Sequence, residues 1–222
     1  MATETVENYL KAIFTLCNES PTHEAGIVRI AAMLGVTKGT ATSMVKKLAA
    51  AKLVKAERYG GVTLSAKGRR AALDVLRRHR LIETFLVQTL KLDWAEVHED
   101  AERLEHALSP RLLDRLDEFL GHPTIDPHGD PIPDSHGRTS ERRGAPLSSF
   151  PRGSDVRVTR VTDQDAAFLS FVATHGLKPG ARASVLAVDQ SAQSISVQAR
   201  GHEPVVMALA AAAEILCEPA RR

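Results

Sequence analysis

Ile27-Val-Arg-Ile-Ala-Ala-Met-Leu-Gly-Val-Thr37, continued by residues 38–51, is the stretch that decides the fold of the N-terminal region of the chain. Apolar residues recur at helical spacing on both sides of Gly35. Thr37 stands where a side-chain cap would begin the second helix. Two short helices joined by a glycine turn are typical of a helix-turn-helix, so the stretch predicts a DNA-binding unit.

Extended segments follow these two helices. Residues 53–58 and 62–65 flank Tyr59-Gly-Gly61, whose glycines suit the turn of a hairpin. A hairpin directly after a helix-turn-helix is the wing of a winged helix. Ahead of both, residues 4–17 carry apolar side chains on one face and predict a first helix.

The second helix of this unit is expected to lie in the major groove, where its exposed side chains meet bases and phosphates. Residues 25–58 are strongly basic, with Glu57 as their only carboxylate. Lys46 and Lys47 suit phosphate contacts, whereas short hydroxyl side chains can contact bases. A helical hairpin with a solvated basic face is the alternative. The predicted DNA-binding residues are Arg29, Thr37, Lys38, Gly39, Thr40, Thr42, Ser43, Lys46 and Lys47.

A second informative stretch is Trp94-Ala-Glu-Val-His-Glu-Asp-Ala-Glu-Arg-Leu-Glu-His106. Read as one helix, it places two imidazoles and two carboxylates on one face, at i, i+4, i+7 and i+8. That spacing is typical of metal ligands, and a solvated face of a charged helix is the alternative. His79 and Glu83 repeat the i, i+4 spacing upstream. The residues of the predicted face are His98, Glu102, Glu105 and His106.

The composition, with 43% hydrophobic and 25% charged residues among 222, is ordinary for a soluble globular protein. We find no apolar run of 18 residues and no basic, apolar leader, so we expect a cytoplasmic protein without a membrane partner. Cys17 and Cys217 stand in apolar surroundings near opposite ends of the chain. They indicate two reduced thiols rather than a disulfide framework.

The remaining segments complete the predicted architecture. A long helix over residues 66–90 precedes the metal stretch, and an apolar helix over 110–120 follows it, which suits a dimer interface or core packing. Residues 139–153 are rich in Pro, Gly, Ser and Arg. Beyond them, strands and one helix over residues 164–175 predict a small SH3-like β-barrel.

We therefore predict a mainly α protein with a small β component. Its expected divisions are a winged helix-turn-helix DNA-binding domain at 1–72, a helical metal-binding and dimerisation domain at 73–138, a linker at 139–153 and an SH3-like domain at 154–222.

Five motifs together resemble the diphtheria toxin repressor family, which includes the iron-dependent and manganese-dependent regulators of bacteria. The resemblance covers nearly the whole chain. It implies a homodimeric transcription factor that binds a divalent metal as co-repressor, binds operator DNA and represses metal-uptake genes. The motifs are Glu7-Asn-Tyr-Leu-Lys-Ala-Ile13, Arg77-Arg-His-Arg-Leu-Ile-Glu83, Glu96-Val-His98, Leu104-Glu-His106 and Asp126-Pro-His-Gly-Asp-Pro-Ile-Pro133.

The resemblance also implies two metal sites. The primary site would use Asn8, Glu102, Glu105 and His106. The ancillary site would use His79, Glu83 and His98, completed by side chains of the SH3-like domain, for which Gln164 and Asp165 are the candidates. Two ions per subunit are then expected, and no organic cofactor.

Position 102 bears on the choice of metal. Iron-type members of the family carry a cysteine there, whereas this chain carries Glu102, as manganese-type members do. A thiolate favours softer metals, and carboxylates suit Mn²⁺. Manganese-type members have Asp where this chain has Asn8 and Glu where it has Lys11, and Asn8 can still ligate through its carbonyl oxygen. We expect Mn²⁺, with Fe²⁺ or another divalent transition metal as the alternative.

Two further functions compete with this interpretation. A metalloenzyme would also use His and Glu on helices, but the chain has no His-Glu-x-x-His pattern, and we expect no enzymatic activity. A winged-helix regulator of an organic ligand would keep the His/Glu cluster as a structural feature, and a chelator would not alter its DNA binding.

Overall fold

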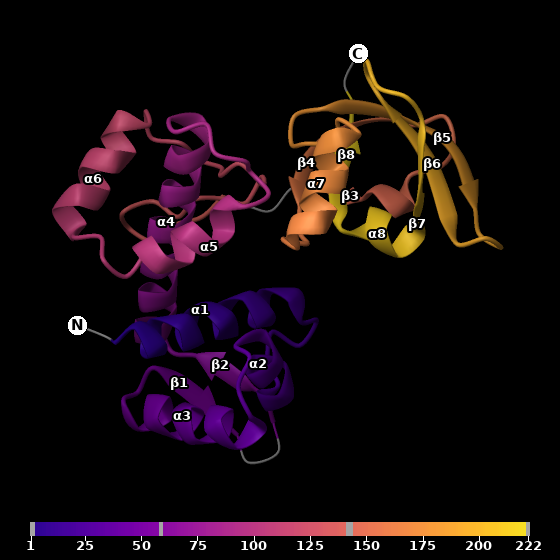
Figure 1. Ribbon diagram of the computed structural model, residues 1–222. Coiled ribbons are helices and arrows are strands. Elements are labelled where there is room, and N and C mark those ends of the chain that lie inside the picture. The colour runs from indigo at the N-terminus through magenta and orange to yellow at the C-terminus, as the bar shows by residue number, and fades with distance from the viewer. Residues whose placement is uncertain (1–2, 58–59, 141–143, 221–222) are drawn as a thin grey trace. The chain divides into compact units, whose positions relative to one another are not determined.

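The computed structural model describes residues 3–57, 60–140 and 144–220 (Figure 1). The chain divides into two compact units. The first unit comprises Met1–His79 with Pro133–Arg138, and the second comprises Arg80–Ile132 with Thr139–Arg222. The finer division into three domains and a linker, expected from the sequence, stays a prediction.

The first unit is a winged helix. The predicted helix-turn-helix is confirmed: Gly35 has a φ of +63°, a left-handed conformation that glycine adopts without strain, and the Thr37 side chain accepts from the amide of Thr40. Leu10, Ile30 and Leu48 meet in its core. Its elements are α1 (Glu4–Glu19), α2 (Ile27–Met33), α3 (Lys38–Ala50), β1 (Val54–Ala56), β2 (Val62–Leu64) and the beginning of α4 (Ala66–Gln88).

The wing is formed by β1 and β2, which pair in antiparallel fashion. Ala25 adds a bridge to Val62, and the carboxylate of Glu24 accepts from the amide of Gly61 at 3.0 Å. Of the predicted turn residues, Tyr59 lies outside the described residues, as does Arg58 of the basic block.

Helices form the N-terminal half of the second unit. The long predicted helix is confirmed as α4, and α5 (Val97–Leu104) and α6 (Pro110–Phe119) follow it. Ser109 accepts from the amide of Leu112 and thereby caps α6, whose first residue is a proline that needs no hydrogen-bond acceptor. A small apolar cluster joins α4 to α5 through Ile82, Leu86, Val97 and Ala101.

A six-stranded antiparallel sheet, in the order β3-β8-β4-β5-β6-β7, forms the rest of the second unit. Within the described ranges β3 and β7 are edges, so strand pairing does not close the barrel expected from the sequence. β3 is two residues long and ends in Pro146, which has no amide hydrogen to extend the pairing. The elements are β3 (Ala145–Pro146), η1 (Leu147–Ser149), β4 (Asp155–Val161), α7 (Ala166–Thr174), β5 (Arg182–Asp189), β6 (Ser194–Ala199), β7 (Val205–Ala208), α8 (Leu209–Ala213) and β8 (Ile215–Pro219).

The core of this sheet takes side chains from α7 and α8, such as Leu169 and Ala212, and Figure 1 shows both helices beside the strands. It also takes Trp94 and Ala95, which lie two to three residues before the start of α5. The helices and the sheet of the second unit therefore share one core. Among the described residues, no helix is long and apolar enough to span a membrane.

Gly68 provides a test of how tightly α4 packs against the residue that precedes β1. A Cβ added there would lie 1.9 Å from the carbonyl oxygen of Leu53, a backbone atom that cannot move aside cheaply. We expect Gly68→Ala to lower the free energy of unfolding by about 3 kcal/mol in a urea titration followed by circular dichroism.

The matched control is Gly39→Ala, where the added Cβ would meet only the Thr37 hydroxyl oxygen, at 3.8 Å. This variant should gain about 0.5–1 kcal/mol, because alanine is the better helix former. Equal effects of the two substitutions would contradict the assigned packing.

Candidate metal centre

The helix that carries His98 is shorter than expected. A single helix over residues 94–106 is wrong, because α5 begins at Val97 and ends at Leu104. Trp94 and Ala95 are held in the sheet core, and the Asp93 carboxylate accepts from the amide of Ala95 in a turn. Glu105 and His106 consequently lie in the turn after α5 rather than on a continuous helical face.

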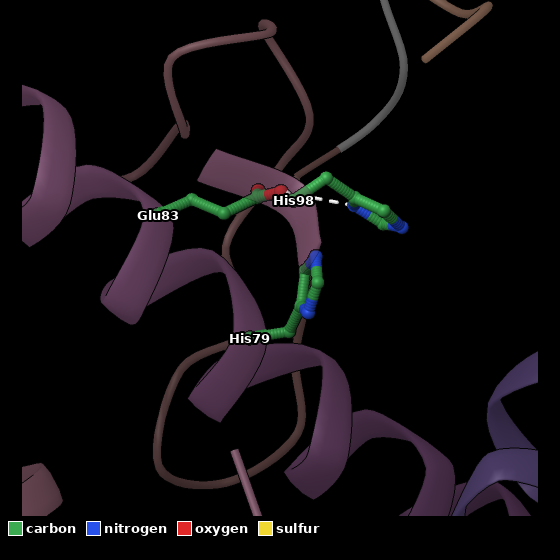
Figure 2. A group of neighbouring side chains, drawn as sticks. All are labelled: His79, Glu83 and His98. Atoms are coloured by element: carbon green, nitrogen blue, oxygen red, sulfur yellow. Dashed lines mark hydrogen bonds and ion pairs between the residues drawn. The ribbon is translucent and has the colours of Figure 1, made fainter. Parts of the chain in front are cut away.

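A first cluster contains the three residues predicted for the ancillary site. His79 and Glu83 lie one turn apart on α4, and Figure 2 shows their side chains extending toward the ring of His98 on α5. Nδ1 of His98 lies 3.2 Å from Oε1 of Glu83, whose side chain is 1% exposed. One ligand atom from each residue lies within 4.8 Å of the others, so the group can hold a metal ion.

A second cluster contains two residues of the predicted primary site. Glu102 and Glu105 each offer an oxygen within 4.8 Å of the other and of a His79 nitrogen. The third predicted ligand, His106, lies next to them, with Nε2 3.5 Å from Oε1 of Glu105. Glu102 also approaches Nε2 of His98, at 3.6 Å. The structure thus gathers the carboxylates and imidazoles of both predicted sites around α4 and α5.

A third cluster, of Glu83, Asp126 and His128, was missed as a metal group by the sequence reasoning and is fully buried. Nδ1 of His128 lies 3.7 Å from Oε2 of Glu83, and Nε2 of His128 lies 2.8 Å from the carbonyl oxygen of Trp94. Because a carbonyl can only accept, Nε2 carries a hydrogen, which leaves Nδ1 as the nitrogen that can bind a metal ion once it is deprotonated. Metal-ligating histidines are typically held in this way by their second nitrogen.

The only sequence signal for this cluster was the alternation Asp126-x-His128-x-Asp130. It lies in a loop, where no helical or strand periodicity indicates which side chains face inward. The Asp126 carboxylate shapes that loop, because its Oδ1 accepts from the amides of His128 and Asp130.

Arginines partly balance the carboxylate charges around the third cluster. Asp130 binds Arg80 at 3.1 Å and Arg160 at 2.8 Å, and Arg80 also lies 3.6 Å from Asp126. Burial, followed by the nearby charges of Asp130 and Glu83, raises the pKa of Asp126 to about 7. Burial alone would lower the pKa of His128, but the hydrogen bond and charge of Glu83 outweigh it, so that pKa is raised. Arg80 and Arg160 thus offset the charge of two of the three carboxylates in this region, Glu83, Asp126 and Asp130.

Asn8, the remaining predicted primary ligand, lies on α1 in the first unit. Its carbonyl oxygen Oδ1 is buried and accepts no hydrogen bond from the described residues. A buried acceptor without a donor costs about 1–3 kcal/mol, and a hard cation would satisfy it. The neighbouring Glu7 is bound to Arg78 of α4 at 2.9 Å, which holds this turn of α1 in place.

Gln164 and Asp165, the candidate ligands from the SH3-like domain, lie at the start of α7. Asp165 caps α7 by accepting from the amides of Ala167 and Phe168. It belongs to none of the three clusters found among the described residues, and Gln164 directly precedes it. Their role as ligands stays a prediction.

The predicted DNA-binding residues lie on and around α3 as expected. Thr37 is used as the cap, Thr42 donates to the carbonyl of Lys38 at 2.7 Å, and Arg29 of α2 binds Glu19 at 3.0 Å. Gly39 and Thr40 lie exposed in the first turn of α3. Four side chains remain without a partner among the described residues and are exposed: Lys38, Ser43, Lys46 and Lys47.

Two apolar side chains of α6 are exposed, Leu112 at 55% and Phe119 at 67%, whereas Leu113 is buried. Leu104 at the end of α5 is also exposed, at 43%. Exposed large apolar residues gathered on neighbouring helices are typical of an interface with a partner.

Breaking the buried ion pairs around Asp130 should destabilise the second unit. Asp130→Asn leaves the half-buried Arg80 and Arg160 without their shared, buried anion, so we expect a loss of about 3–5 kcal/mol in the free energy of unfolding. Glu99→Gln breaks an exposed pair with Arg103 and should cost less than about 1 kcal/mol. Similar losses in the two variants, measured by urea unfolding, would show that the buried pairs do not stabilise this unit.

Three family models match successive segments of the chain. They describe the N-terminal DNA binding domain of iron dependent repressors over residues 1–62, the metal binding and dimerisation domain of iron dependent repressors over 65–134 and the FeoA domain over 145–219. These matches agree with the winged helix, the helical cluster and the sheet described above.

Whole proteins match as well. The iron-dependent repressor IdeR of Mycobacterium leprae is 31% identical over 216 residues, which cover 92% of each chain. The diphtheria toxin repressor of Corynebacterium efficiens is 29% identical over 197 residues, covering 82% of this chain and 83% of that one. The structure of a manganese-dependent transcriptional repressor in complex with manganese matches with a TM-score of 0.89 at 39% identity, covering 97% of this chain and 100% of that one. The chain therefore belongs to the diphtheria toxin repressor family, whose members are metal-dependent transcriptional repressors and not enzymes.

Proposed function

We propose that the chain is a manganese-activated repressor that binds operator DNA in the cytoplasm as a homodimer and controls metal-uptake genes. The observation that carries this proposal is the convergence of Glu102 and Glu105 with His79 in a group able to hold a metal ion. Carboxylate oxygens dominate this group, and hard oxygen ligands suit Mn²⁺.

The primary ion is proposed to bind Glu102, Glu105 and His106, together with the carbonyl oxygen of Asn8. Two carboxylates would neutralise one divalent ion, and the neutral Asn8 adds no excess charge. Asn8 belongs to α1, whereas the other three ligands belong to α5 and the turn after it.

A second ion is proposed at Glu83. The carboxylate of Glu83 is shared by the cluster with His79 and His98 and by the cluster with Asp126 and His128. For this second ion we propose Glu83, His79 and His98 as ligands. The total then agrees with two ions per subunit.

The metal can act as a switch only if its affinity for the DNA-binding conformation of the dimer is higher than its affinity for the other conformations. Two α3 helices of a dimer must lie about 34 Å apart to enter successive major grooves. An ion that limits the motion of the DNA-binding units would favour that spacing. Lys46 and Lys47 would hold phosphates, and the exposed Leu104, Leu112 and Phe119 would form the dimer interface.

Metal-dependent DNA binding tests this function directly. On DNA from upstream of its own gene, the wild-type protein should lose at least about tenfold in affinity when a chelator removes the metal, a typical allosteric coupling. Fluorescence anisotropy measures this under anaerobic conditions. Glu105→Gln should remain a folded dimer by light scattering but bind DNA weakly with or without Mn²⁺.

The control is Glu99→Gln, a carboxylate of α5 that is exposed and belongs to none of the three metal clusters. It should keep the wild-type response. Full Mn²⁺ stimulation of the Glu105 variant would refute the ligand assignment, and a chelator without effect on DNA binding would refute the metal switch.

The choice between manganese and iron depends on the ligand at position 102. In the wild-type protein, Mn²⁺ should drive DNA binding at a lower free concentration than Fe²⁺. Glu102→Cys replaces the hard carboxylate by a soft thiolate and should reverse that order. If Fe²⁺ is already the better activator of the wild type, the protein is an iron-dependent repressor of iron-uptake genes.

A further inference from the structure

Three arginines stand side by side on the outer face of the sheet. Arg157 of β4 is paired in register with Arg182 of β5, and the amide of Arg200, directly after β6, donates to the carbonyl of Arg182 at 2.9 Å. All three are exposed, while their chain neighbours Val156 and Ala183 face the core. The row thus places three positive charges on neighbouring strands.

Like charges directly opposite one another on a sheet are destabilising unless an anion compensates them. Arg157 has such a partner, since its Nε donates to Glu218 at 3.0 Å. Within the described ranges, Arg182 and Arg200 have none. By contrast, two other cations of the same region of the chain are partnered, Arg160 by Asp130 and Lys178 by the ring of Trp94.

The two unpartnered arginines line a hollow of about 420 Å³, together with Ser184, Gln198 and Gly201. Gly201 leaves the hollow open, because a Cβ added to it would meet nothing within 4 Å. One carboxylate, that of Asp155, also lines it and accepts from the Ser184 hydroxyl at 2.6 Å. The arginines therefore outnumber the carboxylate in the hollow by two to one.

We propose that this arginine hollow binds a phosphate group between the side chains of Arg182 and Arg200. A guanidinium presents a planar pair of donors that matches two phosphate oxygens, and two guanidiniums side by side can hold one phosphate from both sides. The side-chain amide of Gln198 donates one hydrogen to the carbonyl of His202 and has a second to offer as a neutral donor. The phosphate can belong to the DNA backbone or to a free phosphate-bearing molecule, and this site is independent of the metal clusters.

Titration of the full-length protein with inorganic phosphate at constant ionic strength tests the site. In nuclear magnetic resonance spectra, the amide signals of Ala183 and Gly201 should shift in a saturable way. Arg182→Gln and Arg200→Gln should each weaken this binding at least tenfold. Arg152→Gln, which removes another exposed arginine that lies outside the hollow, should leave it unchanged.

Absence of saturable shifts in the wild-type protein, or equal binding by all the variants, would overturn the proposal. Once phosphate binding is established, the salt dependence of DNA binding identifies the source. A slope of log affinity against log salt that falls by about one in Arg182→Gln, but not in Arg152→Gln, assigns the site to a DNA phosphate. An unchanged slope assigns it to a free phosphate-bearing molecule.

Discussion

The buried carboxylate of Glu83 is the constraint on which the rest of the second unit depends. At 1% exposure it has almost no water to stabilise its charge, so polar groups of the protein must do so. Nδ1 of His98 from α5 lies 3.2 Å from this carboxylate, and Nδ1 of His128, from the loop after α6, lies 3.7 Å from it. One side chain of α4 thus fixes the positions of two segments that are far apart in the sequence.

His128 connects Glu83 to the sheet through direct contacts. Its carbonyl accepts from the amide of Val161 in β4, its ring stacks on Trp94, and Nε2 bonds to the Trp94 carbonyl. Trp94 in turn lies in the core of the sheet, with Lys178 over its ring. The candidate metal ligands and the sheet are therefore connected by direct contacts. The sheet packs against the helices of the second unit and is not merely tethered to them by a linker.

Much of the fold could be predicted from the sequence because its signals are local. The cap at Thr37, the left-handed turn at Gly35 and the apolar periodicity of α4 each act within a few residues. The extent of α5 could not be predicted, because Trp94 packs in the core of the sheet instead of continuing the helix. The main strands of that sheet begin some 60 residues later in the chain. The same limit applies to the edges of the sheet, which depend on pairing between distant strands.

The metal ligands also divide into those that local sequence spacing predicts and those that only the fold brings together. His79 and Glu83 share a helix, so their spacing alone brings them together, and the family resemblance supplied the choice among the other His and Glu residues. Asp126 and His128 were missed as ligands because a loop has no periodic face. Only the folded chain shows that both point at Glu83.

Trp94 is the single tryptophan of the chain, and it lies where the helices of the second unit meet the sheet. Its indole is therefore a natural optical probe of that junction, because all tryptophan emission of the protein comes from one known place. A change in the environment of His128, or separation of the sheet from Trp94, would alter this tryptophan emission. The packing of the helices on the sheet can therefore be followed by intrinsic fluorescence without a label.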